Sequence, residues 1–448
     1  MEKKLPKNWV FCPLDDLAKI QSGGTPARSN SSYWNGDIPW VKISDIKGLS
    51  VDRATEYITE KGLKNSSATL FPKGTILFTI FATIGRIGVL EIEATTNQAI
   101  AGITPSELIN KKYITYSLLE LSSSILSEGK GVAQKNINQT ILKNTLIPLP
   151  PLPEQTRIVA KLDQLFGQLE QINESLDKIP RLLKDFRQQV LNKGFQTHHD
   201  RVALEKICIK IQDGAHHSPK NLYPINDKGL FPYVTSKNIR NNFMKLDTLT
   251  YVDKEFHDTI YPRCRPEFGD VLLTKDGAST GNVTLNEFDE PISLLSSVCL
   301  IKTDKKKLLP SYLKYFIQSP TGFSELIGQM TGTAIKRIVL KKIKKATIPL
   351  PSIQEQKKIV TRVEMLFAKA DTIEQQYQTL KQKIVTLPQS ILHKAFKGEL
   401  VPQLESDGDA RELLETINGL KKENGKVKEK KPKAYKVEGV ELGRVTEK

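Results

Sequence analysis

Lysine and arginine are the residue types of this 448-residue chain that most clearly indicate a function. Lys and Arg number 66 against 50 Asp and Glu, which gives a formal net charge of +16. Such an excess favours a polyanionic partner such as nucleic acid, although an anionic membrane surface would also fit. The densest basic run is 336–345 (KRIVLKKIKK), which has six basic residues and no acidic one. The composition therefore directs attention first to binding.

Catalytic patterns, by contrast, are missing from the sequence. It contains no Walker A motif, no HExxH and no Asn-Pro-Pro-Tyr/Phe methyltransferase motif. His216 and His217 lie with Asp213 in a polar loop, and a lone pair of this kind is more often structural than metal-binding. Asp270 and Lys275 could be forced into a nuclease pattern, but GDVLLTKDG is better interpreted as a strand and a turn. We expect no catalytic residue, no metal site and no cofactor bound by this chain.

Cysteine use and the N-terminus indicate a cytoplasmic protein. Cys12, Cys208, Cys264 and Cys299 lie far apart, without zinc-ligand spacing, as expected for free thiols in a reducing compartment. The opening residues MEKKLPKNWV do not form a signal peptide, and the most apolar run, 75–90, is too short for a membrane span.

The elements that must position the basic residues begin with a long internal repeat. The stretch 147–195 returns at 348–396 with a constant offset of 201 residues and no insertion. Both copies begin with a Pro-rich segment followed by Glu-Gln, at Glu154-Gln155 and Glu355-Gln356. A repeat of this length indicates a duplicated structural unit.

Apolar residues within each repeat follow alternating steps of four and three, which is a 3.5-residue period. That period is the signature of a coiled-coil seam, whereas two amphipathic helices on separate cores remain an alternative. The predicted seam residues are Ile158, Leu162, Leu165, Leu169, Ile172, Leu176, Ile179, Leu183, Ile359, Val363, Leu366, Ile373, Tyr377, Leu380 and Ile384.

Connectivity then predicts the geometry of the two helices. The first helix leaves one globular block and reaches a second, so a second helix on the same seam must run back, antiparallel to the first. Pro180 and Pro388 each predict a kink or a short break. The expected fold class is α+β, with two globular domains containing twisted sheets, separated by two long antiparallel helices in a pseudo-two-fold dumbbell.

Composition and the repeat also set the expected domain boundaries. Block one and block two contain loosely similar segments, such as IPWVKISDIKG at 38–48 and FPYVTSKNIRN at 231–241. We expect a charged C-terminal tail, 402–448, that is disordered apart from one short helix near 409–420. The predicted segments are 1–146 (first globular domain), 147–199 (central helix), 200–347 (second globular domain), 348–401 (distal helix) and 402–448 (tail).

These motifs resemble those of the DNA specificity subunits of type I restriction–modification systems. The resemblance rests on the PLPxxEQ start of a long helix, repeated after two variable blocks, and on LPKNW at 5–9 followed by SGGTPARSNSSYWNGDIPWVKISDIKG at 22–48. It implies that the blocks are target recognition domains, each reading one half of an asymmetric, bipartite DNA site, and that the helices set the gap. It also implies a non-catalytic chain that binds double-stranded DNA and two methylation subunits. Restriction subunits would complete the complex, and S-adenosylmethionine, ATP and Mg would be bound by the partner subunits.

Residues that could contact DNA are Lys and Arg for phosphates, with Arg, Lys, Asn and Gln for base edges. The candidates are Arg28, Lys42, Lys47, Arg86, Lys130, Gln134 and Lys135 in block one, and Lys220, Lys237, Asn238, Arg240, Lys275, Lys336 and Arg337 in block two. A non-enzymatic coiled-coil adaptor whose blocks bind proteins remains the alternative function, and an enzyme with an unrecognised site is a weaker one.

Overall fold

The computed structural model describes residues 5–81, 83–128, 138–196, 199–328 and 337–426. The chain forms two compact units, which we call unit 1 (Met1–Asn173 with Gln382–Lys448) and unit 2 (Glu174–Lys381). The two long helices, α5 (Leu152–Phe195) and α11 (Ile353–Ala395), each contribute residues to both units.

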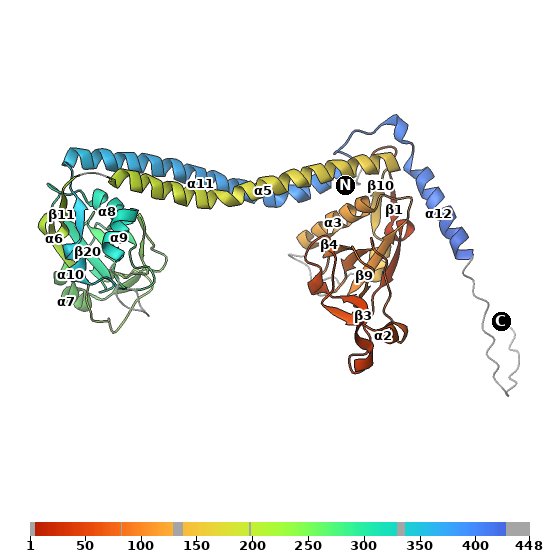
Figure 1. The fold of residues 1–448 in the computed structure, drawn as a ribbon, viewed down its shortest axis with the longest axis horizontal. Helices are drawn as coiled ribbons and strands as arrows, with labels where there is room; N and C mark the ends of the chain where they lie inside the picture. Colours follow the sequence, from red (N-terminus) through yellow and green to blue (C-terminus); the bar gives the residue numbers. More distant parts are fainter. Residues whose placement is uncertain (1–4, 82, 129–137, 197–198, 329–336, 427–448) are drawn as a thin grey trace. The chain divides into compact units, whose positions relative to one another are not determined.

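Unit 1 contains two sheets and a short two-stranded ribbon (Figure 1). The five-stranded sheet has the order β2 (Ala18–Ser22), β9 (Ile100–Pro105), β6 (Ile76–Thr79), β7 (Ile87–Leu90) and β4 (Ser50–Val51). The three-stranded sheet has the order β5 (Glu56–Ile58), β3 (Trp34–Val41) and β8 (Thr95–Thr96). The ribbon pairs β1 (Val10–Pro13) with β10 (Leu146–Leu149). The connecting helices are α1 (Leu14–Leu17), η1 (Ser31–Tyr33), η2 (Ile43–Asp45), α2 (Glu60–Lys64), α3 (Lys111–Glu128) and α4 (Gln139–Lys143).

Unit 2 repeats most of this topology, although its larger sheet lacks a strand in the place of β4. Its four-stranded sheet has the order β12 (Cys208–Asp213), β20 (Val298–Thr303), β17 (Val271–Thr274) and β18 (Val283–Leu285). Its three-stranded sheet has the order β16 (Thr250–Val252), β13 (Phe231–Val234) and β19 (Ser293–Leu294). Two ribbons pair β11 (Arg201–Ala203) with β21 (Thr347–Pro349) and β14 (Ile239–Arg240) with β15 (Phe243–Met244). Its helices are α6 (Leu204–Ile207), α7 (Lys254–Cys264), α8 (Pro310–Gln318), α9 (Pro320–Ile327) and α10 (Leu340–Lys345).

The matching strand orders confirm the predicted α+β class and the duplication of the globular blocks. In each unit a strand rich in Pro and aromatic residues, β3 or β13, pairs antiparallel with one neighbour and parallel with the other. Strand β6 ends at Thr79, whose carbonyl accepts a hydrogen bond of 2.9 Å from the Gly85 N–H.

Antiparallel pairing of α5 and α11 is confirmed within each unit. In unit 2, Arg187 of α5 contacts Asp371 of α11 at 2.7 Å, and Asp177 of α5 contacts Lys381 of α11 at 2.6 Å. Residue numbers therefore rise along α5 in the direction in which they fall along α11. In unit 1, Ile158 and Leu162 near the start of α5 share a core with Leu392 at the end of α11.

The predicted seam is only partly buried. Ile158, Leu162, Leu176, Leu183 and Val363 are buried, and most of the others are half-buried. The prediction is wrong for Ile172, Ile373 and Leu380, which are 49%, 46% and 46% exposed. A pair of helices covers only the side of each seam that faces its partner, so apolar side chains that point to the flank stay open to water.

Neither proline breaks its helix. α5 continues through Pro180 and α11 through Pro388, so the short break that the sequence suggested is wrong. Proline removes one intrahelical hydrogen bond. Pro180 lies on an exposed stretch, where water can satisfy the carbonyl that is left unpaired.

The repeated Glu-Gln motif fastens each helix start to its own globular block. The Gln155 side chain accepts a hydrogen bond from the Asn110 N–H and donates one to the Pro150 carbonyl. Gln356 repeats this arrangement with the Leu309 N–H and the Pro351 carbonyl. Both glutamine side chains are fully buried, so the motif has a structural reason to recur.

The short helix expected near 409–420 is present and longer, as helix α12 (Ala410–Lys426), so the expected disorder of the tail is wrong for residues 421–426. Ala410 and Ile417 are buried in the core of unit 1. The segment before α12 is held by Arg157, whose guanidinium makes hydrogen bonds of 2.7 and 2.6 Å to the two oxygens of the buried Asp407 carboxylate. Residues 427–448 lie outside the described residues. Within the part of the chain that the structure covers, no helix combines the length and the apolar character that crossing a bilayer requires.

Candidate nucleic-acid interface

Two predicted DNA-contacting residues of unit 1, Arg28 and Lys42, meet at a single carboxylate. Arg28 Nη1 lies 2.5 Å from Glu56 Oε2, and Lys42 Nζ lies 2.6 Å from Glu56 Oε1. The Arg28 guanidinium also lies over the rings of Trp34 and Trp40, 3.7 and 4.8 Å from their centroids. An indole face attracts a cation and restricts its motion.

Local structure explains how this cluster forms. β3 brings Trp34 and Trp40 to one region, and their indole N–H groups donate to the Ala27 and Gly24 carbonyls at 3.2 and 2.9 Å, which fixes the loop that carries Arg28. The hydrogen bond from Lys42, helped by that from Arg28, lowers the pKa of Glu56 below its ordinary value despite partial burial. Glu56 is therefore ionised at neutral pH, and it holds two cations at a surface where the Arg28 side chain is 54% exposed.

Lys47 and Arg86 also lie on the surface of unit 1. Lys47 occupies the exposed turn after η2, and Arg86 donates from Nη1 to the Ile43 and Ile46 carbonyls at 3.1 and 3.3 Å. Arg86 therefore supports the turn that carries Lys47, and its own side chain remains exposed. The other predicted contacts in this block, Lys130, Gln134 and Lys135, lie outside the described residues, as does Lys336 in block two.

Unit 2 contains a related surface, with one correction to the prediction. Lys220 and Lys237 are exposed, and Arg240 is half-buried. Asn238, however, is only 1% exposed, and its side-chain oxygen accepts hydrogen bonds from the Thr235 N–H and hydroxyl. Its amide nitrogen donates to the Lys245 carbonyl at 3.2 Å, so Asn238 caps a turn and its side chain is buried away from the surface.

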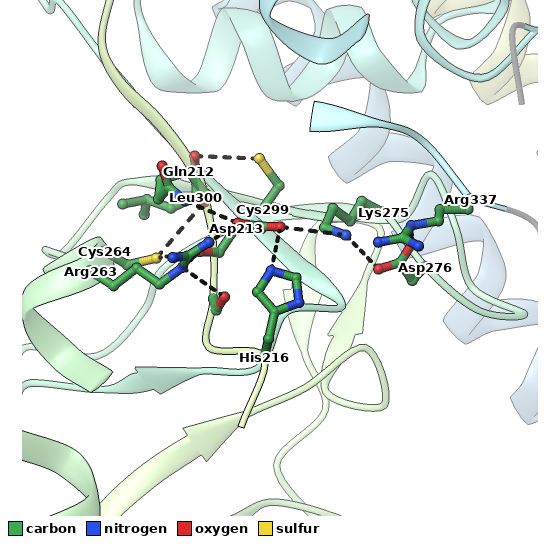
Figure 2. A network of polar contacts seen from close by, with 11 residues as sticks. Gln212, Asp213, His216, Arg263, Cys264, Lys275, Asp276, Cys299, Leu300 and Arg337 are labelled. Atoms are coloured by element: carbon green, nitrogen blue, oxygen red, sulfur yellow. Dashed lines mark hydrogen bonds and ion pairs between the residues drawn. The ribbon is translucent and has the colours of Figure 1, made fainter. Parts of the chain in front are cut away.

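Lys275 is the second correction, because it is 2% exposed and lies inside a polar network (Figure 2). Its Nζ lies 2.5 Å from Asp276 Oδ2 and 3.7 Å from Asp213 Oδ2. Arg337, by contrast, has a 56% exposed side chain, and its Nε lies 3.1 Å from Asp276 Oδ1. The network thus excludes Lys275 from DNA contact and orients Arg337 at its outer edge.

Asp213 is the centre of this network. Arg263 contacts it at 2.7 Å, and His216 Nε2 lies 3.3 Å away. Burial opposes ionisation of Asp213, but the hydrogen bond from Arg263 and the charge of Lys275 outweigh it, so its pKa lies below the ordinary value. Among the described residues no group of three or more His, Cys, Asp and Glu is placed to hold a metal ion.

The described part of the basic run, residues 337–345, ends in helix α10. Lys341, Lys342 and Lys345 line a shallow hollow together with Val339 and Glu325. Glu325 accepts hydrogen bonds of 2.9 Å from both the N–H and the hydroxyl of Thr347. The hollow is therefore positively charged overall and suits an anionic ligand such as a phosphate.

Sequence reasoning missed several residues that build these surfaces. Trp34 and Glu56 hold Arg28, but nothing in the sequence indicated that they would contact it. Asp213, which lies beside Lys275, and Arg263, which contacts Asp213, come together from a strand and a helix that are distant in sequence. The repeated Glu-Gln motif was visible, although its hydrogen-bonding role was not.

Comparisons with known proteins agree with this architecture. The sequence model of the family described as "Type I restriction modification DNA specificity domain" matches residues 6–181 and 203–382. The type I restriction enzyme EcoBI specificity subunit of Escherichia coli is 29% identical in an alignment of 456 residues that covers 93% of this chain and 93% of that protein. The EcoKI specificity subunit of Escherichia coli strain K12 is 27% identical and covers 96% of this chain and 99% of its own length.

A solved structure has the same fold. The crystal structure of the HsdS subunit from Thermoanaerobacter tengcongensis superposes with a TM-score of 0.63 and 18% identity, over 88% of this chain and 98% of that one. Two family matches, one on each of the duplicated units, together cover most of the chain. The duplicated blocks and their paired helices therefore belong to the family of type I restriction–modification DNA specificity subunits.

Proposed function

We propose that this chain selects the DNA sequence on which a type I restriction–modification complex acts. The globular part of each unit reads one half of an asymmetric, bipartite site, and the helices α5 and α11, which span both units, set the gap between the halves. The observation that carries this proposal is the duplicated topology with different cationic residues in corresponding places. Lys42 of unit 1 corresponds to Thr235 of unit 2, and Lys47 corresponds to Arg240, so each unit offers its own reading surface.

Recognition rather than catalysis is the proposed contribution of this chain. Cations supported on fixed turns supply phosphate contacts, which give affinity and register. S-adenosylmethionine, ATP and Mg would be bound by methylation and restriction subunits, and the complex would act on DNA in the cytoplasm. Two equivalent methylation subunits fit a duplicated scaffold.

The helices offer places where such partners could dock. Ile172 and Ile373 occupy the same position in the two repeats, and both are about half exposed, at 49% and 46%. An additional apolar helix lying along either α5 or α11 would remove these side chains from water. Equivalent exposed residues on the two repeats support two equivalent partner sites.

The test is a competition binding experiment on the chain co-expressed with its methylation partner, at physiological salt. Methylation-sensitive sequencing of the host DNA would first identify the site. We expect cognate DNA to bind at least a hundredfold more tightly than scrambled DNA. Arg28→Ala should weaken binding and lower the slope of log K against log salt by about one, whereas Lys184→Ala, an exposed lysine on α5, should change neither. Equal affinity for cognate and scrambled DNA would contradict the proposal and favour a protein-binding adaptor.

A further inference from the structure

A turn with an exposed apolar side chain occupies the same place in both units. In unit 1 it joins η2 to β4, with Ile46 buried, Lys47 and Gly48 exposed, and Leu49 44% exposed. In unit 2 the corresponding turn, residues 241–242, joins β14 to β15. Ile239 is buried and Arg240 is half-buried. Phe243, the first residue of β15, is 54% exposed and lies one position beyond Asn242, the counterpart of Leu49. Each turn thus places a cation beside a large apolar side chain that faces water.

Hydrogen bonds establish that the two turns correspond. Before each turn an Asx side chain accepts from a backbone N–H three residues earlier: Asp45 from Lys42 at 2.9 Å, and Asn238 from Thr235 at 2.9 Å. After this cap, the buried isoleucine carbonyl accepts from a side chain that precedes the neighbouring strand. Arg86 donates to Ile46 at 3.3 Å in unit 1, and Asn282 donates to Ile239 at 3.2 Å in unit 2.

Both turns are also fixed to the adjacent strand, so the exposed side chain is presented on a defined backbone. The Val89 N–H donates to the Leu49 carbonyl at 2.7 Å. In unit 2, the Asn242 N–H donates to the Val283 carbonyl at 3.2 Å, and the Val283 N–H donates to Asn241 Oδ1 at 3.1 Å. Asn242 has a φ of 73°, a left-handed conformation that asparagine tolerates better than most residues.

The surroundings of these side chains are cationic. Lys47 adjoins Gly48 and Leu49 in unit 1, and Lys237 and Arg240 precede Phe243 in unit 2. Single exposed apolar residues are common on protein surfaces. Here, however, a cation at the same turn position is followed by a large exposed apolar side chain in both units, after two residues in unit 1 (Lys47, Leu49) and after three in unit 2 (Arg240, Phe243).

We propose that Leu49 and Phe243 determine specificity by contacting the 5-methyl group of a thymine, one in each half of the DNA site. The thymine methyl is the apolar feature of the major-groove edge, and apolar side chains are its usual partners. Lys47 and Arg240 would hold neighbouring phosphates, which sets the depth of each turn in the groove. The inference rests on the proposed function and adds the identity of a base contact to it.

The test replaces thymine by uracil, which lacks only the methyl group. In the complex assembled with its methylation partner, each thymine of the cognate site is changed singly to uracil, and binding is measured by competition. For the wild-type chain we expect one uracil in each half-site to weaken binding about fourfold, the factor for one buried methyl group. Phe243→Ala should abolish the uracil effect in one half only, and Leu49→Ala in the other half only.

Phe268→Ala is the matched control, because Phe268 is a 60% exposed phenylalanine that lies before β17 in unit 2. It should leave both uracil effects unchanged, and all three variants should keep wild-type affinity for scrambled DNA, which shows that they fold. The inference is overturned if Phe243→Ala and Leu49→Ala retain both uracil effects, if they weaken thymine and uracil DNA equally, or if either half-site contains only G·C pairs. A wild-type complex that prefers cognate DNA but ignores uracil would overturn this inference alone, whereas one that shows no preference would overturn the proposed function.

Discussion

Lys275→Met probes the buried network of unit 2, and unit 1 supplies an internal comparison for it. The Lys275 N–H donates to the Ser297 carbonyl, and the Ile80 N–H of unit 1 donates to the Ala99 carbonyl in the same register, both at 2.9 Å. Both side chains are buried, at 2% and 3% exposed. Unit 2 has therefore placed a charge where unit 1 has an aliphatic side chain.

The structure gives the expected cost of the substitution. Without Lys275, Asp276 loses its 2.5 Å contact and Asp213 loses one of its cations, although Asp213 keeps Arg263 at 2.7 Å. Removing one partner of a buried ion pair costs about 3 to 5 kcal/mol, and the remaining Arg263 contact favours the lower end, about 3 kcal/mol. With an m-value of about 2 kcal/mol/M, the urea midpoint of unit 2 should fall by about 1.5 M.

The double variant Asp213→Ser/Lys275→Ile copies the arrangement of unit 1. Ser22 of unit 1 lies opposite Ala101, as Asp213 lies opposite Cys299, so the serine replaces the aspartate at an equivalent position. A well-packed apolar replacement of a buried ion pair is often neutral or stabilising. We therefore expect the double variant to lie within about 1 kcal/mol of the wild-type stability.

Urea unfolding monitored by hydrogen exchange in β17 and β20 would measure the stability of unit 2 separately from that of unit 1. Exchange in β6 and β9 of unit 1 is the control and should not change. A single variant with the wild-type midpoint would show that Lys275 stabilises nothing. A double variant as unstable as the single one would show that the charges are needed for more than mutual neutralisation.

Three further predictions concern other parts of the chain. Gln155→Ala should destabilise the helix start in unit 1 by about 2 kcal/mol, because the partly buried Asn110 N–H loses its partner. Hydrogen exchange should rise near residues 110 and 152–156, while the matched variant Gln356→Ala should act near residues 309 and 353–357 instead. The hydrogen bond from Arg157 lowers the pKa of Asp407. The contact therefore stabilises α12 fully above the unfolded pKa of about 3.9, and this stabilisation is lost as the pH falls through the lower folded pKa. Hydrogen exchange of α12 should increase in acid in the wild type but not in Arg157→Leu, and equal acid sensitivity in both would contradict the assignment. Glu56→Gln should strengthen binding to scrambled DNA and steepen the salt slope by about one, because it removes the negative charge that Arg28 and Lys42 share; an unchanged slope would indicate that neither cation meets phosphate.

The sequence alone determined the repeated helices, the duplication of the blocks and the antiparallel direction of the pair. These features follow from local periodicity, from a constant offset and from chain connectivity, all of which can be traced along the printed residues. Seam positions such as Leu162 and Leu183 are buried as predicted. The same pattern could not show that Ile172 stays exposed, because exposure depends on how many neighbours surround the seam.

Only the tertiary structure decided which charged residues are available to DNA. Lys275 and Asn238 are residue types that commonly contact phosphates or base edges, yet both are enclosed in the fold. Asp213, from a distant strand, lies beside Lys275, whereas the Asn238 amide donates to the Lys245 carbonyl within its own hairpin. Similarly, Asp407 docks the segment before α12 on Arg157, 250 residues away, although the composition there predicted disorder. Burial of a polar side chain depends on partners supplied by other elements, so it is a property of the packed fold and cannot be inferred from neighbouring residues.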